Sequence, residues 1–158
     1  VEAGYKCNMT DIMAAIGQVG LETYDSETLP TRKTICEVYS NQLAKYEWAE
    51  LPVFTNDSKS IESSYHLYPL RIKGITSEQR DQIIQEIFDR DVSVNVHFIP
   101  VPQTSYYAKM GYDMSDYPVT VDNFTREISL PVFYDLTNEM RTRVLKAVVE
   151  SVEKVRND

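Results

Sequence analysis

The chain has 158 residues, of which 42% are hydrophobic and 25% are charged, a composition typical of one folded domain and not of a disordered chain. With 16 Lys and Arg residues against 24 Asp and Glu residues, the formal net charge is −8, which argues against nucleic-acid binding because an acidic surface repels phosphate backbones. No apolar run approaches the roughly 20 residues of a membrane-spanning helix, and two cysteines are too few for a disulfide framework or a zinc site.

The N-terminal third of the chain is predicted to be helical. Thr10 or Asp11 can cap a first helix, because apolar residues then recur at helical spacing as far as Val19. The Thr-Leu-Pro sequence at 28–30 breaks or kinks this pattern, since a residue before proline avoids the helical region. A second helix is predicted from Thr31, with an apolar face made of Ile35, Val38, Tyr39, Gln42 and Leu43.

The middle of the chain alternates between strand and helix patterns. Residues 47–62 are rich in turn-forming types and are predicted to be a loop. Residues 64–73 favour a strand, in which Pro69 indicates an edge position or a bulge. Thr76 and Ser77 then cap a helix that runs to about Asp89. Residues 92–98 give the clearest strand pattern, because valines alternate with polar side chains.

The C-terminal third completes the predicted order of elements. Residues 104–111 favour a short helix closed by Gly111, and residues 113–125 are predicted to be a polar connection. Residues 127–130 favour a short strand, and Thr137 opens a final helix with an apolar stripe. This order predicts an α+β domain with one small sheet covered by helices.

Familiar catalytic and metal-binding motifs do not occur in the sequence. There is no Gly-x-Ser-x-Gly motif, and five glycines form no phosphate-binding loop. The two histidines, His66 and His97, are 31 positions apart and have no acidic residue at metal-ligand spacing, so no metal site is expected.

Two stretches nevertheless concentrate polar chemistry. The first, residues 4–11, places Lys6 and Asn8 just ahead of a predicted helix N-terminus, where backbone N–H groups and the helix dipole favour anions. The second places His97, Tyr106 and Tyr107 around prolines at a predicted strand end, a common position for binding residues. From spacing alone, an ordinary capped helix is the favoured explanation of the first stretch, and a structural cluster of aromatic residues explains the second at least as well as a binding site does.

Taken together, four segments resemble the C-terminal part of the DegT/DnrJ/EryC1/StrS sugar-nucleotide aminotransferases. Residues 4–19 resemble the family's run beginning Gly-Tyr-Lys-Tyr-Asn-Met-Thr-Asp, and residues 65–71 resemble its Tyr-His-Leu-Tyr-Pro-Ile-Arg strand. Residues 97–101 with Tyr107 resemble its His-Tyr-x-Pro-Val…Tyr-Tyr segment, and residues 128–137 resemble its Ser-Leu-Pro ending. The four segments occur in family order and at family spacing.

The resemblance implies the aspartate aminotransferase fold, whose small C-terminal domain has a mostly antiparallel sheet of about three strands covered by helices. It also implies that an amino group moves, usually from glutamate, to a keto sugar on a nucleotide, with pyridoxal phosphate as cofactor and a homodimer as the assembly. Nucleotide sugars and this cofactor are cytoplasmic and no export signal is visible, so we expect a cytoplasmic protein that binds neither nucleic acid nor membrane.

The resemblance assigns roles residue by residue. Asn8 and Lys6 match positions that in this family reach the cofactor phosphate of the partner subunit, although many members have Asn in place of Lys6 and Arg in place of Asn8. His97, Tyr106 and Tyr107 match the segment that lines the sugar-nucleotide pocket. In the family the lysine that binds the cofactor covalently belongs to the N-terminal domain, so no catalytic residue is expected in this chain.

The sequence therefore predicts a fragment of a longer enzyme, a prediction that agrees with a start at Val1 in place of Met. Residues 1–50 would be helices that connect to the large domain, residues 51–158 would be the small domain, and the fragment alone would be inactive. Apolar surface is expected to be exposed along the helices of Ile12 and Ile35, which would pack on the large domain. The alternative is a stand-alone α+β module that binds a partner and catalyses nothing.

Overall fold

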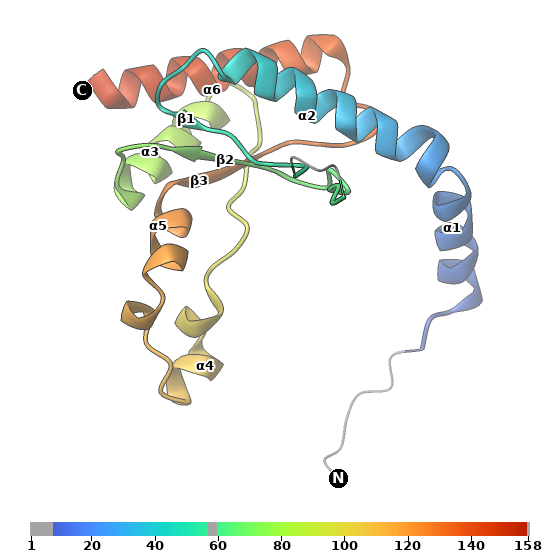
Figure 1. Ribbon diagram of the computed structural model, residues 1–158, viewed down its shortest axis with the longest axis horizontal. Helices are drawn as coiled ribbons and strands as arrows, with labels where there is room; N and C mark the ends of the chain where they lie inside the picture. The colour runs from blue at the N-terminus through green and yellow to red at the C-terminus, as the bar shows by residue number, and fades with distance from the viewer. Residues whose placement is uncertain (1–7, 57–59, 158) are drawn as a thin grey trace.

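The computed structural model describes residues 8–56 and 60–157. Within these residues, one sheet has three strands in the order β1, β2, β3 (Figure 1), which span Ala49–Glu50, Tyr68–Ile72 and Glu127–Leu130. Both strand pairs are antiparallel, and the register sets Ala49 opposite Ile72 and Leu70 opposite Ile128. The predicted fold class, an α+β domain with a small antiparallel sheet, is confirmed.

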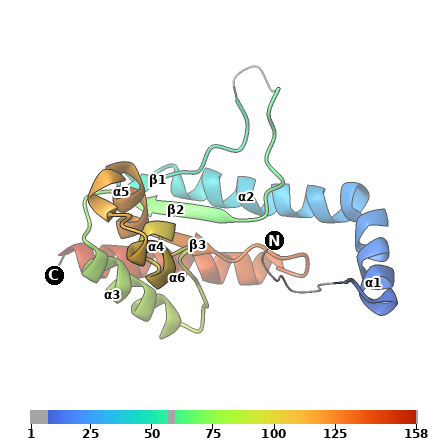
Figure 2. The same ribbon diagram turned by 90° about the horizontal axis from the view of Figure 1, so that it is seen from below.

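Three long helices form the core with this sheet. Helices α2 (Leu29–Leu43) and α6 (Asn138–Asn157) lie side by side along it, and α3 (Ser77–Phe88) packs against α6 (Figures 1 and 2). Fully burying one large aliphatic side chain contributes about 1.5–3 kcal/mol, so this cluster is the main source of stability. The largest fully buried side chains of the core include Tyr39, Tyr68, Ile35, Leu43, Leu70, Ile72, Ile83 and Ile87.

The predicted helix starts are confirmed where a side chain caps the helix. Thr76 and Gln79 form a capping box on α3, in which the Thr76 hydroxyl accepts from the Gln79 amide at 3.3 Å and the Gln79 side chain accepts from the Thr76 amide at 3.0 Å. The Thr137 hydroxyl accepts from the Met140 amide at 3.2 Å at the start of α6. In both places a threonine satisfies a backbone N–H that has no partner inside its helix.

The first helix, α1 (Asp11–Glu22), begins at Thr10 as predicted and buries no residue. It is joined to α2 by a π-helical turn, Tyr24–Thr28, and it stands away from the sheet (Figure 1). The predicted interruption at 28–30 therefore lies slightly earlier, since α2 begins at Leu29 with Pro30 in its first turn. Proline is tolerated there because the first-turn N–H groups have no helical partner.

Residues 101–126 form an arm that projects from the sheet in Figure 1. It contains the 3-10 turns Val101–Gln103 and Met114–Asp116 and two helices, α4 (Ser105–Lys109) and α5 (Pro118–Arg126). Gly111 follows α4 with φ at +87°, as its predicted helix-closing role requires. The prediction of an irregular connection over 113–125 is wrong, because Asp122 and Arg126 form an ion pair at i, i+4 that supports α5.

Three strand predictions need correction. Residues 92–98 show the expected alternation of burial but pair with β3 through one isolated bridge, Asn95 to Ser129, since the chain then turns away into the arm. The predicted loop 47–62 contains β1. Pro69 lies in β2, the central strand, and not in an edge strand. Proline is tolerated there because β1 pairs only with Arg71 and Ile72 and does not reach Pro69.

No helix in the described part of the chain is long and apolar enough to cross a membrane.

Candidate functional site

The first candidate residues lie at the start of α1. Asn8 is exposed two residues before Thr10, the N-cap residue of α1, whose hydroxyl accepts from the Met13 amide at 3.3 Å. Lys6 lies outside the described residues. An exposed amide just ahead of a 12-residue helix suits contact with an anion, because the helix dipole is positive at that end.

His97 lies at the base of the arm. Its backbone N–H donates to Oε2 of Glu127 at 3.1 Å, and its ring packs edge-to-face on Phe98 with centroids 4.7 Å apart. The His97–Phe98 peptide bond is cis. Among the described residues the ring atom Nδ1 is buried and has no hydrogen-bond partner. His97 is therefore held by its backbone, and its ring retains an unused polar atom.

Glu127, which belongs to no motif singled out in the sequence, is the anchor for His97. It is 6% exposed at the start of β3, and the Ser129 hydroxyl donates to its Oε1 at 2.5 Å. Burial raises the pKa of Glu127, while hydrogen bonds from Ser129 and His97 and the charges of His97 and Arg80 oppose that rise. A lone acidic residue before a short apolar strand gives no sequence signal of this role, since its partner is 30 positions away.

A shallow groove of about 370 Å³ opens beside this pair. One wall is the segment from His97 to Val101, and the other is α5, which contributes Thr120, Asn123 and Phe124. Glu127 lines the groove as well. The Asn123 amide oxygen accepts from Arg71 at 2.7 Å, and the Arg80 guanidinium lies 5.2 Å from the Phe124 ring centroid. These contacts hold the α5 wall, and the groove presents apolar surface, one imidazole and one hydroxyl.

Tyr106 and Tyr107 lie on α4, at the end of the arm away from the sheet (Figure 1). They pack edge-to-face at 5.3 Å, and Tyr107 packs on Tyr112 in the same way at 5.7 Å. Both side chains are exposed and neither lines the groove of His97. The predicted residues thus occupy three places in this chain, namely the start of α1, the base of the arm and the end of the arm.

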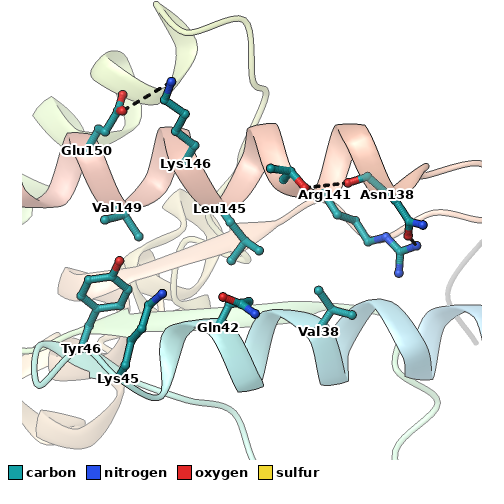
Figure 3. A pocket seen from close by; sticks show the side chains of 11 residues that line it. Val38, Gln42, Lys45, Tyr46, Asn138, Arg141, Leu145, Lys146, Val149 and Glu150 are labelled. Atoms are coloured by element: carbon teal, nitrogen blue, oxygen red, sulfur yellow. Dashed lines mark hydrogen bonds and ion pairs between the residues drawn. The ribbon is translucent and has the colours of Figure 1, made fainter.

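A larger hollow lies elsewhere, between α2 and α6, with a volume of about 580 Å³ (Figure 3). Val38, Leu145 and Val149 form its apolar part, and Lys146 beside it pairs with Glu150 at 3.8 Å. None of the predicted binding residues lines it. It contains no nucleophile activated by a neighbouring base, so its size alone does not make it a catalytic site.

The described residues fit one part of a cofactor site but not the whole of it. Asn8 and the start of α1 are suited to a phosphate group. A lysine that binds the aldehyde group of pyridoxal phosphate covalently needs an enclosed pocket. All lysines at described positions, however, lie at the surface. Within residues 8–56 and 60–157, no group of three or more His, Cys, Asp or Glu side chains could hold a metal ion.

Large apolar side chains are exposed on α1 and on the arm. On and beside α1 they are Met9, Ile12, Met13, Ile16, Val19 and Leu21, all more than 60% exposed. At the base of the arm, Phe98, Ile99 and Val101 are exposed near the groove. The expectation of exposed apolar surface holds for the helix of Ile12 and is wrong for that of Ile35, which is 1% exposed because α2 packs into the core.

Comparison with known proteins gives consistent matches over nearly the whole chain. A sequence model described as the DegT/DnrJ/EryC1/StrS aminotransferase family matches residues 1–149. An uncharacterized protein of Methanocaldococcus jannaschii is 32% identical over 99% of this chain and 40% of its own length. The spore coat polysaccharide biosynthesis protein SpsC of Bacillus subtilis is 30% identical over 95% of this chain and 38% of its own length.

A solved structure matches equally well. The pyridoxal-phosphate form of the putative sugar aminotransferase Spr1654 from Streptococcus pneumoniae superimposes with a TM-score of 0.89 at 37% identity. The match covers 98% of this chain and 38% of that one. The chain therefore spans about two fifths of the length of the proteins that it resembles.

Proposed function

Because the chain belongs to the DegT/DnrJ/EryC1/StrS aminotransferase family, we propose that it is the C-terminal part of an enzyme that transfers an amino group to a keto sugar. The observation that carries this proposal is the family match over residues 1–149, together with the shared fold of the pneumococcal sugar aminotransferase. The acceptor would be linked to a nucleotide and the donor would be glutamate. The product would serve polysaccharide or amino-sugar biosynthesis, the process named for the Bacillus relative.

Pyridoxal phosphate, when bound, supplies the electron sink that allows an amino group to move between a donor and a ketone. In that reaction this chain would help to bind the cofactor phosphate and to orient the sugar acceptor. The Asn8 amide and, in the complete protein, the Lys6 ammonium would donate to phosphate oxygens of the cofactor. The phosphate would belong to the partner subunit of a homodimer, so the start of α1 would complete a site that the partner chain mainly builds.

The base and the end of the arm would contact the sugar nucleotide at two separate points. His97 presents an imidazole and Phe98, Ile99 and Val101 present apolar surface beside the groove. Tyr106 and Tyr107 present phenol groups and ring faces on α4. Aromatic faces suit stacking on a base, and hydroxyl groups suit the many oxygen atoms of a sugar. The arm would thus orient the acceptor, while the large domain supplies the covalent chemistry.

The 158 residues alone would not catalyse transamination, because no described lysine lies in an enclosed pocket. The exposed apolar faces of α1 and the arm favour a further protein part that covers them. The competing hypothesis is a stand-alone binding module, in which no large domain covers those apolar faces.

A segment exchange tests the proposal. The matched segment of the pneumococcal aminotransferase is replaced by this chain, and the purified chimera is incubated with pyridoxal phosphate, glutamate and a nucleotide-linked keto sugar. We expect retained cofactor absorbance and formation of an amino sugar, with the unaltered pneumococcal protein as positive control. A chimera that folds and dimerises like that control yet transfers no amino group would contradict the proposal.

A further inference from the structure

Glu127 is a buried carboxylate without an ion-pair partner among the described residues. It is 6% exposed, and the two hydrogen bonds that it accepts from described residues come from neutral donors, the Ser129 hydroxyl and the His97 amide. Arg80 influences Glu127 through its charge, but its own donors bind Asp81 and the Phe124 carbonyl oxygen. Burying a carboxylate in this way is costly, and an apolar side chain at the start of β3 would avoid that cost.

The two carboxylate oxygens hold two different parts of the chain. Oε1 accepts from Ser129, two residues along the same strand, so the carboxylate is oriented by β3 itself. Oε2 accepts from the backbone amide of His97, 30 residues earlier in the sequence. The side chain therefore acts as a clamp between the sheet and the first residue of the groove wall.

Residues 97–101, which we call the arm-base segment, need such a clamp. The last backbone pairing before them is the bridge between Asn95 and Ser129, with N···O distances of 2.7 and 3.3 Å. Among residues 8–56 and 60–157, no further ladder bond holds the chain between that bridge and the turn at Val101. The bond from the His97 amide to Glu127 is therefore a contact with β3 that follows this bridge along the chain.

We propose that Glu127 is a positioning residue, whose carboxylate holds the His97 amide and thereby fixes the arm-base segment at the sugar-binding surface. The inference rests on the proposed function for its link to substrate, but the clamp itself is a property of this chain. Glu127 also lines the groove, but it is 6% exposed and both of its carboxylate oxygens are engaged, so its role would be exerted through His97.

The choice of variants separates positioning from charge. In Glu127→Gln, the amide oxygen can still accept from His97 while its NH2 group donates to Ser129, so the clamp survives without a negative charge. In Glu127→Ala both bonds are lost. Ser129→Ala loosens the carboxylate but leaves the backbone bridge to Asn95 in place. Glu150→Ala, at an exposed position of α6 away from the arm (Figure 3), is the matched control.

Amide NMR of the 158-residue chain tests the clamp directly. We expect the chemical shift of the His97 amide proton to follow the titration of the Glu127 carboxyl. That titration should lie above the ordinary Glu range, since burial raises the pKa of Glu127. His97 and Arg80 are the other charged groups that bear on it. The titration should vanish in Glu127→Gln with the other arm-base shifts retained, and Glu127→Ala should move the shifts of residues 97–101. Unchanged shifts in Glu127→Ala would overturn the proposal, and Ser129→Ala gives the same readout if Glu127→Ala fails to fold.

Kinetics of the chimera test the link to substrate. Glu127→Ala should raise KM for the keto sugar by about tenfold while kcat falls less than about threefold, because orientation of the acceptor is lost and the chemistry is not. Glu127→Gln should restore KM to within about threefold, and Glu150→Ala should leave it unchanged. An unchanged KM in Glu127→Ala would overturn the proposal. If the unsubstituted chimera is inactive, the proposed function fails and the NMR measurement still decides on the clamp.

Discussion

The Tyr39 hydroxyl donates a hydrogen bond to the backbone carbonyl oxygen of Pro131 at 3.0 Å, which ties the middle of α2 to the residue that follows β3. Tyr39 is fully buried and packs edge-to-face on Tyr68 of the central strand at 5.2 Å. This single side chain thus joins the helix layer, the sheet and the loop leading to α6.

Loss of that hydroxyl should destabilise the chain. We expect Tyr39→Phe to lower the free energy of unfolding by about 1 kcal/mol, because the Pro131 carbonyl loses its donor while the ring packing is kept. Urea unfolding followed by circular dichroism measures the change. Tyr134→Phe is the control, since the exposed Tyr134 hydroxyl donates to Glu27 at the surface and its loss should cost less than about 0.5 kcal/mol. Equal losses of unfolding free energy in the two variants would contradict a larger contribution from the Tyr39 hydrogen bond.

The capping box of α3 gives a second stability prediction. Thr76→Ala removes the acceptor for the Gln79 amide and should cost about 1 kcal/mol. Thr76→Ser keeps the hydroxyl and should stay within about 0.5 kcal/mol of the unsubstituted chain. The same unfolding measurement applies, and a serine variant as unstable as the alanine variant would rule out the cap as the cause.

The ion pair between Glu50 and Arg126 predicts a pH dependence of stability. The hydrogen bond from Arg126, at 2.6 Å, is the main reason that the pKa of Glu50 lies below its usual value of 4.5. A carboxyl whose pKa is lowered by folding stabilises the protein above its unfolded pKa, and this contribution disappears as the pH falls through the folded pKa. Glu50→Gln should therefore cost up to about 1 kcal/mol at pH 7 and nothing at strongly acidic pH. A cost that is the same at both pH values would contradict this assignment.

Substitutions on α1 should separate folding from assembly. Ile12→Glu and Ile16→Glu should change the unfolding free energy of the isolated chain by less than about 0.5 kcal/mol, because α1 buries no residue. Ile35→Ala in the core should instead cost about 2–5 kcal/mol.

In the chimera, we expect the two α1 substitutions to reduce dimer formation, as judged by size-exclusion chromatography with light scattering. That result would support the proposal that residues 1–50 connect to the large domain. Dimers of normal stability would instead indicate that the apolar face of α1 remains uncovered in the complete enzyme.

Local patterns allowed much of the fold to be predicted, because caps and periodic burial act within a few residues. Thr10, Thr76 and Thr137 are examples, and each begins a helix as predicted. Strand pairing depends on partners distant in sequence, so local patterns do not reveal the short strand Ala49–Glu50 and overstate the pairing of residues 92–98.

The candidate site shows the same division between local and distant determinants. His97 was found through its proline-rich surroundings and the family resemblance, whereas Glu127 became visible only when β3 brought it beside His97. Likewise, the sequence placed His97, Tyr106 and Tyr107 in one stretch, but the intervening turn and α4 carry the tyrosines to the end of the arm.

The most direct test of the central claim is amino transfer by the chimera in its Asn8→Ala and unsubstituted forms. We predict that the unsubstituted chimera converts a nucleotide-linked keto sugar into the amino sugar with glutamate as donor. Because Asn8 would donate to the cofactor phosphate, Asn8→Ala should lose bound pyridoxal phosphate at least about tenfold faster on dialysis, as a lost charge-assisted hydrogen bond implies. A folded, dimeric chimera that forms no amino sugar would contradict the account, and so would an Asn8→Ala variant that retains the cofactor as firmly as the parent.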